Sequence, residues 1–255
     1  MSTETFKPLP EMVQAHAERA PSKIALIQDE QQLSYGALDT LMDRVAAALQ
    51  RDGLAPRDSV AICAGTSSEY AAAFLGALRA GVAVAPIAPS STADSIVDMI
   101  ADCGAKVFFV DRSVAEALGD RLNTLKAKVV GLDDGAPGTP FSAFLAPEGS
   151  RPAPVAIHED MPFNIIYSSG TTGTPKGIVQ SHGMRFGHVM RAAPMGYGEN
   201  TVALLSTPLY SNTTLVSFFP AIGWGGAVVL MKKFDAAHYL ELAQRHRATH
   251  TMLVP

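Results

Sequence analysis

A loop of glycines, hydroxyl side chains and one lysine is the part of this sequence best suited to chemistry. It directly follows the apolar run 163–167 and ends at Lys176-Gly177. Glycines let the backbone approach a ligand so that N–H groups point at an anion, while hydroxyls and lysine add donors and positive charge. The candidate anion-binding residues are Ser168, Ser169, Gly170, Thr171, Thr172, Gly173, Thr174, Pro175 and Lys176. Together they predict a cradle for a polyphosphate.

The loop differs from the common phosphate loop, because Pro175 precedes the lysine and Gly177 follows it. Along its whole length, 166–177, it resembles the signature of the adenylate-forming (AMP-binding) superfamily, Tyr-Thr/Ser-Ser-Gly-Thr-Thr-Gly-x-Pro-Lys-Gly. The Ser-His pair that follows in the family is present as Ser181-His182. A surface turn rich in small residues is the alternative, which the length of the match disfavours.

The superfamily includes acyl-CoA and aryl-CoA synthetases, luciferases and the adenylation domains of peptide synthetases. Three further segments resemble its motifs, namely 33–38, 75–81 and 233–235. The resemblance implies that ATP, Mg²⁺ and coenzyme A are used and that a carboxylic acid is activated to acyl-AMP with release of pyrophosphate. It implies phosphate contacts and catalytic roles for Lys176 and Thr171, and no metal ligand in this chain. The acyl group would then pass to coenzyme A, which makes the enzyme an acid–thiol ligase.

A second segment, 207–214, resembles the family's Pro-Leu/Met-Phe/Tyr-His motif, which lines the carboxylate site. The resemblance implies a substrate-binding role for Tyr210, Ser211, Asn212 and Thr213, although Ser211 stands where the family usually has histidine. A core position is the alternative for Tyr210. No acidic residue lies between 210 and 219, so the ammonium of a free amino acid would lack a partner. The apolar neighbours in this stretch favour a fatty or aromatic acid.

Two alternatives remain open: an adenylation domain that loads a carrier-protein thiol, and a nucleotide-binding fragment without catalysis of its own. The family's Tyr-Gly-x-Thr-Glu stretch, its ribose-binding aspartate and its mobile C-terminal domain have no counterpart in residues 1–255. We therefore expect an incomplete N-terminal domain, with little activity by itself.

Composition places the chain among globular proteins and argues against nucleic acid as a partner. Hydrophobic residues make up 47% and charged residues 17% of 255, with a net charge of −4. Scattered basic residues predict no nucleic-acid binding, so the expected partner is a small carboxylic acid, with the oligomeric state left open. Cys63 and Cys103 are expected to be buried free thiols, and the absence of a visible signal peptide suggests a cytoplasmic protein.

Short apolar strands alternate with helices along the chain, which predicts an α/β fold with parallel sheets. The expected strands are 60–63, 82–87, 106–110, 177–180, 202–205, 227–231 and 250–254. The expected helices are 38–49 with Ser34 as N-cap and Gly53 as stop, 68–80, one around 96–100, 184–193, and one from its cap Asp235 to about 246. The proline-rich stretch 133–160 is expected to be an exposed connector.

The superfamily resemblance implies two interleaved subdomains, with roughly residues 10–60 and 200–255 sharing one sheet and the middle of the chain forming the other. The uncharged stretch 200–231 is expected to form a buried wall rather than a membrane span, because prolines and glycines interrupt it. His182 could contact a ligand or make a structural hydrogen bond; His188, His238, His246 and His250 are expected to be structural or solvated.

Overall fold

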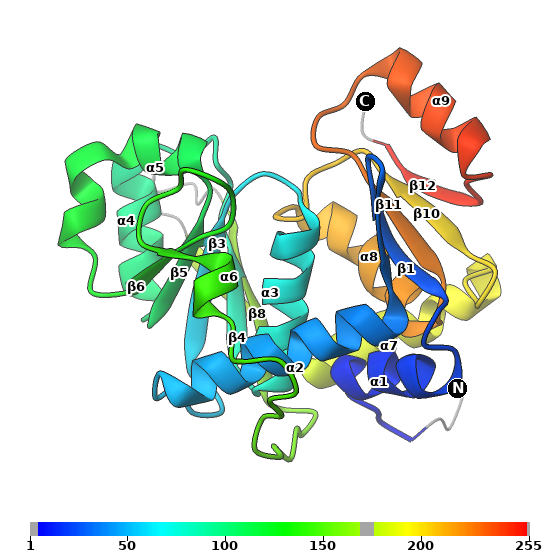
Figure 1. Ribbon diagram of the computed structural model, residues 1–255, viewed down its shortest axis with the longest axis horizontal. Helices are drawn as coiled ribbons and strands as arrows, with labels where there is room; N and C mark the ends of the chain where they lie inside the picture. Colours follow the sequence, from blue (N-terminus) through cyan, green and yellow to red (C-terminus); the bar gives the residue numbers. More distant parts are fainter. Residues whose placement is uncertain (1–4, 169–175, 254–255) are drawn as a thin grey trace.

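The strands form two sheets, which lie side by side in the computed structural model (Figure 1). The structure describes residues 5–168 and 176–253. In the five-stranded sheet the order is β12-β10-β11-β1-β2, formed by β1 (Ile24–Gln28), β2 (Gln31–Ser34), β10 (Val202–Leu205), β11 (Ala227–Leu230) and β12 (His250–Met252). In the seven-stranded sheet the order is β7-β6-β5-β3-β4-β8-β9, formed by β3 (Ser59–Cys63), β4 (Ala83–Pro86), β5 (Val107–Val110), β6 (Lys128–Gly131), β7 (Thr139–Pro140), β8 (Pro162–Ser168) and β9 (Lys176–Ser181).

The pairing is parallel except between β1 and β2 and between β8 and β9. The chain starts in the first sheet, forms the second sheet, and returns to the first sheet at β10. The predicted interleaved α/β fold is therefore confirmed. The first part of the chain leaves the first sheet before β3, which begins at Ser59 in the second sheet, in agreement with the approximate limit near residue 60.

Helices fill the space between the sheets and cover their outer faces (Figure 1). The helices are α1 (Leu9–Arg19), α2 (Tyr35–Arg51), α3 (Ser68–Arg79), α4 (Ala93–Asp102), α5 (Arg112–Leu118), α6 (Phe141–Phe144), α7 (His182–Ala192), α8 (Asn212–Gly223) and α9 (Ala236–Arg245). Strand residues alternate between the two faces: Val60 and Ile62 of β3 join the central core, whereas Ala61 and Cys63 pack in a second cluster with α4 and α5. Both faces of the second sheet are thus covered, as expected for parallel strands.

Local capping explains where several helices begin. Ser34 accepts a hydrogen bond from the Ala37 N–H, and Asp235 accepts one from the His238 N–H, so both predicted caps are confirmed. After α2 the backbone turns at Gly53, whose φ of 83° lies in the left-handed region that favours glycine. These local signals made the ends of α2 and the start of α9 readable in the sequence.

The stretch 133–160 is not wholly an exposed connector, contrary to the prediction. It contains β7 and the single-turn helix α6, whose Phe141 and Phe144 are buried. The Phe144 ring packs edge-on against Phe109 of β5, with ring centroids 5.5 Å apart. The proline content indicated irregular backbone correctly, but these two aromatic side chains anchor that backbone to the core.

The uncharged stretch 200–231 forms β10, α8 and β11, and most of its side chains are buried. Among the described residues, no helix has both the length and the apolar character needed to cross a membrane. Cys63 is buried and free as predicted, while Cys103, also free, is only partly buried. Burial raises the pKa of the Cys63 thiol, which keeps it protonated.

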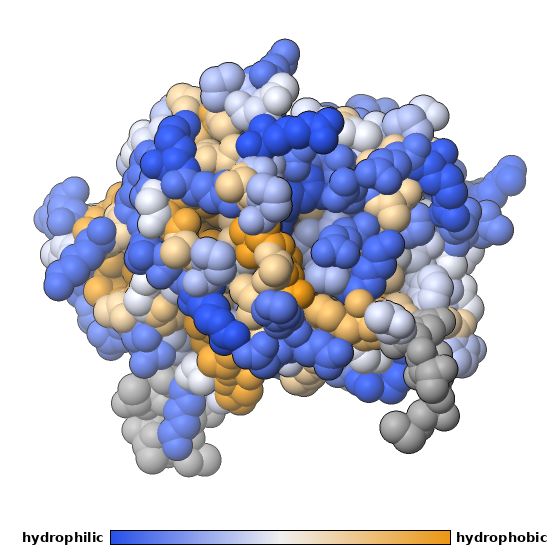
Figure 2. Space-filling view, turned by 90° about the horizontal axis from the view of Figure 1, so that it is seen from below, coloured by the Kyte–Doolittle hydropathy of each residue, from blue (hydrophilic) through white to orange (hydrophobic). Residues whose placement is uncertain are grey.

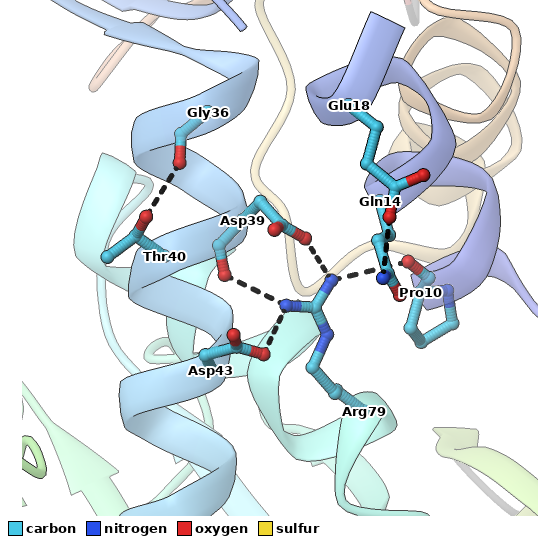
Figure 3. A network of polar contacts seen from close by, with 8 residues as sticks. All are labelled: Pro10, Gln14, Glu18, Gly36, Asp39, Thr40, Asp43 and Arg79. Atoms are coloured by element: carbon cyan, nitrogen blue, oxygen red, sulfur yellow. Dashed lines mark hydrogen bonds and ion pairs between the residues drawn. The ribbon is translucent and has the colours of Figure 1, made fainter. Parts of the chain in front are cut away.

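Arg79 connects the three helices α1, α2 and α3 (Figure 3). Its Nη1 donates to the Asp39 carbonyl at 2.8 Å and to Asp43 Oδ1 at 2.7 Å, and its Nη2 donates to the Asp39 carboxylate. Nη2 also lies 3.4 Å from the carbonyl oxygen of Pro10 at the start of α1. The Arg79 side chain is only 10% exposed, so one guanidinium satisfies two carboxylates in a largely desolvated position.

We expect Arg79→Leu to lower the free energy of unfolding by about 2–4 kcal/mol, because it leaves two facing carboxylates without a cation. Urea denaturation followed by circular dichroism measures the change. The matched control is Arg112→Leu, since Arg112 forms an exposed pair with Glu116 within α5 and its loss should hardly affect stability. Equal effects of the two substitutions would contradict the structural role of Arg79.

Candidate functional site

The two strands that flank the predicted polyphosphate loop in the sequence form an antiparallel hairpin. Strands β8 and β9 pair from Pro162↔Ser181 to Ser168↔Lys176, so the return strand predicted at 177–180 is confirmed. Ser168 and Lys176, the two described members of the loop, are exposed and face each other at its base. The other predicted residues, Ser169, Gly170, Thr171, Thr172, Gly173, Thr174 and Pro175, lie outside the described residues.

Tyr167 anchors the loop end of this hairpin to α4. Its hydroxyl oxygen lies 2.6 Å from Asp102 Oδ2 and 3.1 Å from the Met99 carbonyl oxygen. Burial and the hydrogen bond to Asp102 raise the pKa of Tyr167, so the phenol remains a donor. On the neighbouring strand, a Cβ added at Gly177 would lie 3.0 Å from Ile165 Cγ2 and 3.2 Å from Tyr167 Cε1. A glycine at 177 therefore lets β9 pack closely against the Tyr167 ring.

The outer edge of the hairpin is apolar. Strand β9 is the last strand of the seven-stranded sheet, and its Ile178 and Val179 are 52% and 58% exposed. The view from below shows apolar areas among the polar surface of this side of the molecule (Figure 2). The hairpin thus presents polar groups at its loop end and apolar groups along its free edge.

The predicted acid-binding residues lie where α8 begins. The backbone turns before the helix, with the Ser211 N–H donating to the Pro208 carbonyl at 3.0 Å. The Leu209 N–H donates to Thr66 Oγ1 at 3.1 Å, which ties this turn to the loop after β3. Tyr210, Ser211 and Asn212 are half-buried and Thr213 is exposed. Tyr210 is therefore only partly buried, between the predicted substrate-facing position and the alternative of a core position.

Arg185 of α7, which was not predicted as a site residue, joins the hairpin to this second segment. Its Nε donates to Asn164 Oδ1 on β8 at 2.9 Å, and its Nη2 donates to Asn212 Oδ1 at 2.8 Å and to the Gln180 side chain on β9. The side chain is buried, with the guanidinium carbon 5.3 Å from the Phe219 ring centroid. Burial lowers the pKa of Arg185 to about 10, which leaves it charged at neutral pH.

Two polar residues within the strands could have pointed to Arg185. Asn164 interrupts the apolar run that precedes the loop, and Gln180 follows Ile178 and Val179 on the return strand. Both are buried and both accept from Arg185. Buried amides need partners, so their presence signalled a polar group nearby, although it did not identify which one.

His182, at the start of α7, is buried beside the same cluster. Its ring packs edge-on against Phe163 with centroids 4.9 Å apart, and neither ring nitrogen has a hydrogen-bond partner among the described residues. Burial lowers the pKa of His182 to about 4, so the imidazole is neutral. The His182 ring therefore makes no structural hydrogen bond within the described part of the chain, which was one of the two roles expected from the sequence.

Two concave regions lie at or near the predicted acid-binding segment 207–214. A cavity of about 500 Å³ is lined by Ser206, Thr207, Pro208, Met231, Lys232, Lys233, Phe234 and Leu253, at the carboxyl ends of β10, β11 and β12. Its size suits a small molecule, and its lining is largely apolar. Tyr210 to Thr213 follow Thr207 and Pro208 in the chain but do not line it.

A larger cleft of about 790 Å³ opens between the carboxyl ends of the two sheets. Its acidic lining residues are Asp29, Glu30, Glu69, Asp111, Asp133 and Asp134, with Lys232 as the basic one. This negative charge would repel the carboxylate of an acid or the triphosphate of ATP. The larger cleft is therefore a poorer site for either ligand than the smaller cavity. Across residues 5–168 and 176–253, no cluster of three His, Cys, Asp or Glu side chains could hold a metal ion.

The comparison with protein families matches residues 13–255 to the AMP-binding enzyme family. The chain is 31% identical to the indoleacetate–CoA ligase of Aromatoleum aromaticum over 97% of its length and 49% of that protein. It is 34% identical to the 4-coumarate–CoA ligase 5 of Oryza sativa subsp. japonica, over 88% of its length and 42% of that protein. It is also 34% identical to the phosphinothricin tripeptide synthetase PhsB of Streptomyces viridochromogenes, over 88% of its length and 18% of that protein.

These curated relatives are therefore at least about twice as long as the chain. Among solved structures, a putative long-chain-fatty-acid CoA ligase from Rhodopseudomonas palustris superposes with a TM-score of 0.89 and 23% identity, over 98% of this chain and 64% of that one. The apo structure of MbtA from Mycobacterium smegmatis gives 0.86 at 23% identity, over 97% of this chain and 48% of that one. At this identity the superpositions establish the fold, while the family match covers nearly the whole sequence. The chain belongs to the AMP-binding enzyme family.

Proposed function

We propose that this chain takes part in the ATP-dependent activation of a carboxylic acid to acyl-AMP, followed by acyl transfer to coenzyme A. The observation that carries the proposal is the polar link between the hairpin of the signature loop and the acid-binding segment, made by Arg185. The proposal draws further support from the indoleacetate–CoA and 4-coumarate–CoA ligases among the relatives. As their names state, these two relatives join indoleacetate and 4-coumarate, both aromatic acids, to coenzyme A.

The reaction brings two anions together. A carboxylate oxygen attacks the α-phosphorus of ATP, and the bond between that phosphorus and the bridging oxygen of pyrophosphate breaks. Such a step is accelerated mainly by neutralising phosphate charge and by holding the reactants in line. Lys176 offers an exposed ammonium group at the base of the loop, and the loop sequence supplies glycines and hydroxyls. Mg²⁺ bound with the nucleotide would supply further positive charge against the triphosphate.

The proposed acid is aromatic or fatty. No carboxylate is present in the sequence from 210 to 219 to pair with an ammonium group, and the neighbouring cavity of about 500 Å³ has a largely apolar lining. A carrier-protein thiol is the second candidate acceptor, because PhsB, a tripeptide synthetase, is as similar in sequence as the plant ligase. In either case acyl transfer breaks the carbonyl–oxygen bond of acyl-AMP and forms a thioester, with AMP leaving.

Acid-dependent ATP–pyrophosphate exchange tests this proposal, measured on the 255-residue chain and on any longer product of its gene. We expect exchange with 4-coumarate, indole-3-acetate or octanoate at least about tenfold above that with L-amino acids, since an unpaired ammonium is costly to bury. The chain by itself should bind ATP with little turnover. If no product of the gene shows exchange with any of these acids, the enzymatic proposal is refuted. Thioester formation with coenzyme A, compared with thioester formation on a phosphopantetheinyl carrier protein, separates the two candidate acceptors.

Lys176→Ala should lower acyl-AMP formation by about 10²–10³-fold, because it removes a positive charge from the developing pyrophosphate. The measurement is the exchange rate at saturating acid, in the gene product that shows exchange. Lys176 is exposed, so the fold should be retained and circular dichroism should match the wild type. The control Lys126→Ala alters another exposed lysine and should leave the rate unchanged. Near-normal turnover of Lys176→Ala would contradict the assignment.

A further inference from the structure

Arg185 is a buried cation without a carboxylate partner among the described residues. Its side chain is 1% exposed, and all its hydrogen-bond acceptors are amide oxygens. Its Nη1 has no partner in residues 5–168 and 176–253. Burying an unpaired charge is costly, and an apolar residue of similar size would avoid that cost. An arginine at this buried position therefore points to a task other than stabilising the fold.

The three amides that Arg185 contacts differ in how firmly the backbone holds them. Asn164 and Gln180 are register partners in the ladder between β8 and β9, so backbone hydrogen bonds already fix them. Asn212 opens α8, and the side chain of the preceding cap residue, Ser211, makes no capping hydrogen bond. The hairpin is therefore the anchor, and Asn212 is the group that Arg185 holds in place.

This contact also determines which way the Asn212 amide points. A guanidinium group only donates hydrogen bonds, so the oxygen of Asn212 faces Arg185 and its NH₂ group faces away as a donor. We propose that Arg185 is a positioning residue that orients Asn212 toward the carboxylic acid and so sets the affinity for the acid rather than for ATP. This inference rests on the proposed function. Lysine cannot replace the arginine, because a single ammonium cannot span three amides in a fixed fork.

Hydrogen exchange measured by mass spectrometry tests the positioning without any substrate. In Arg185→Lys, the amides of 213–215 should exchange at least about tenfold faster, as expected when a charge-assisted hydrogen bond is lost. Exchange in 162–168 and 176–181 should stay within about twofold of the wild type, because the strand ladder persists. Unchanged exchange at 213–215, or equal loosening of the hairpin, would overturn the proposal.

Asn212→Ala removes the hydrogen bond between Arg185 and Asn212 but keeps the buried arginine. It therefore provides a second test if Arg185→Lys folds poorly. It should reproduce the faster exchange at 213–215, and the double variant should show no further increase, because both substitutions remove one interaction. The matched control is Arg191→Lys, an exposed position on the same helix, which should change nothing. Additive effects in the double variant would count against a shared contact.

The kinetic readout uses ATP–pyrophosphate exchange with whichever acid of the panel gives the highest wild-type rate. Both Arg185→Lys and Asn212→Ala should raise the KM for that acid about tenfold, whereas the KM for ATP should change less than about twofold. A parallel rise of both KM values would indicate general structural damage and refute the proposal. Absence of wild-type exchange would instead refute the proposed function, and hydrogen exchange would still decide the role of Arg185.

Discussion

A cluster of three buried phenylalanine rings determines how the two halves of the molecule meet. Phe163 of β8 lies 4.9 Å from Phe219 of α8, and Phe74 of α3 lies 5.5 Å from Phe219, measured between ring centroids. These rings come from the second sheet and from two helices of the central layer, so their packing sets the sheet against that layer. Close-packed rings tolerate little displacement, which makes this contact a rigid reference for everything attached to it.

The candidate site is attached to that reference. Phe163 lies on β8, the strand that leads to the signature loop, and Phe219 lies on α8, which begins at the proposed acid-binding residues. The guanidinium carbon of Arg185 lies 5.9 Å from the Phe163 ring centroid and 5.3 Å from the Phe219 ring centroid. Arg185 also donates hydrogen bonds to Asn164 of β8 and Asn212 of α8. The ring packing and the hydrogen bonds of Arg185 therefore both fix the distance between β8 and α8. In the proposed reaction that distance separates the triphosphate from the acid.

Prediction succeeded where a local pattern was sufficient. The apolar strands at 60–63 and 202–205 and the caps Ser34 and Asp235 depend on neighbouring residues alone. It failed where burial depended on distant partners. Helix α8 was not predicted, because its uncharged sequence lacks the polar face that marks a surface helix. The strands β1 and β2 were also missed, and residues 141 and 144 were assigned to the surface although the core accommodates both rings.

The sequence by itself determined the family, the alternation of strands and helices, and the hairpin that carries the loop, because these depend on residue types at short spacing. Tertiary structure alone decided that Asn164, Gln180 and Asn212 converge on Arg185. Residues 164 and 212 are far apart in the chain, and Arg185 lies on a helix that sequence could not orient. The face of α7 that is buried depends on strands formed by distant parts of the chain, so the spacing of residues within 182–192 does not predict it.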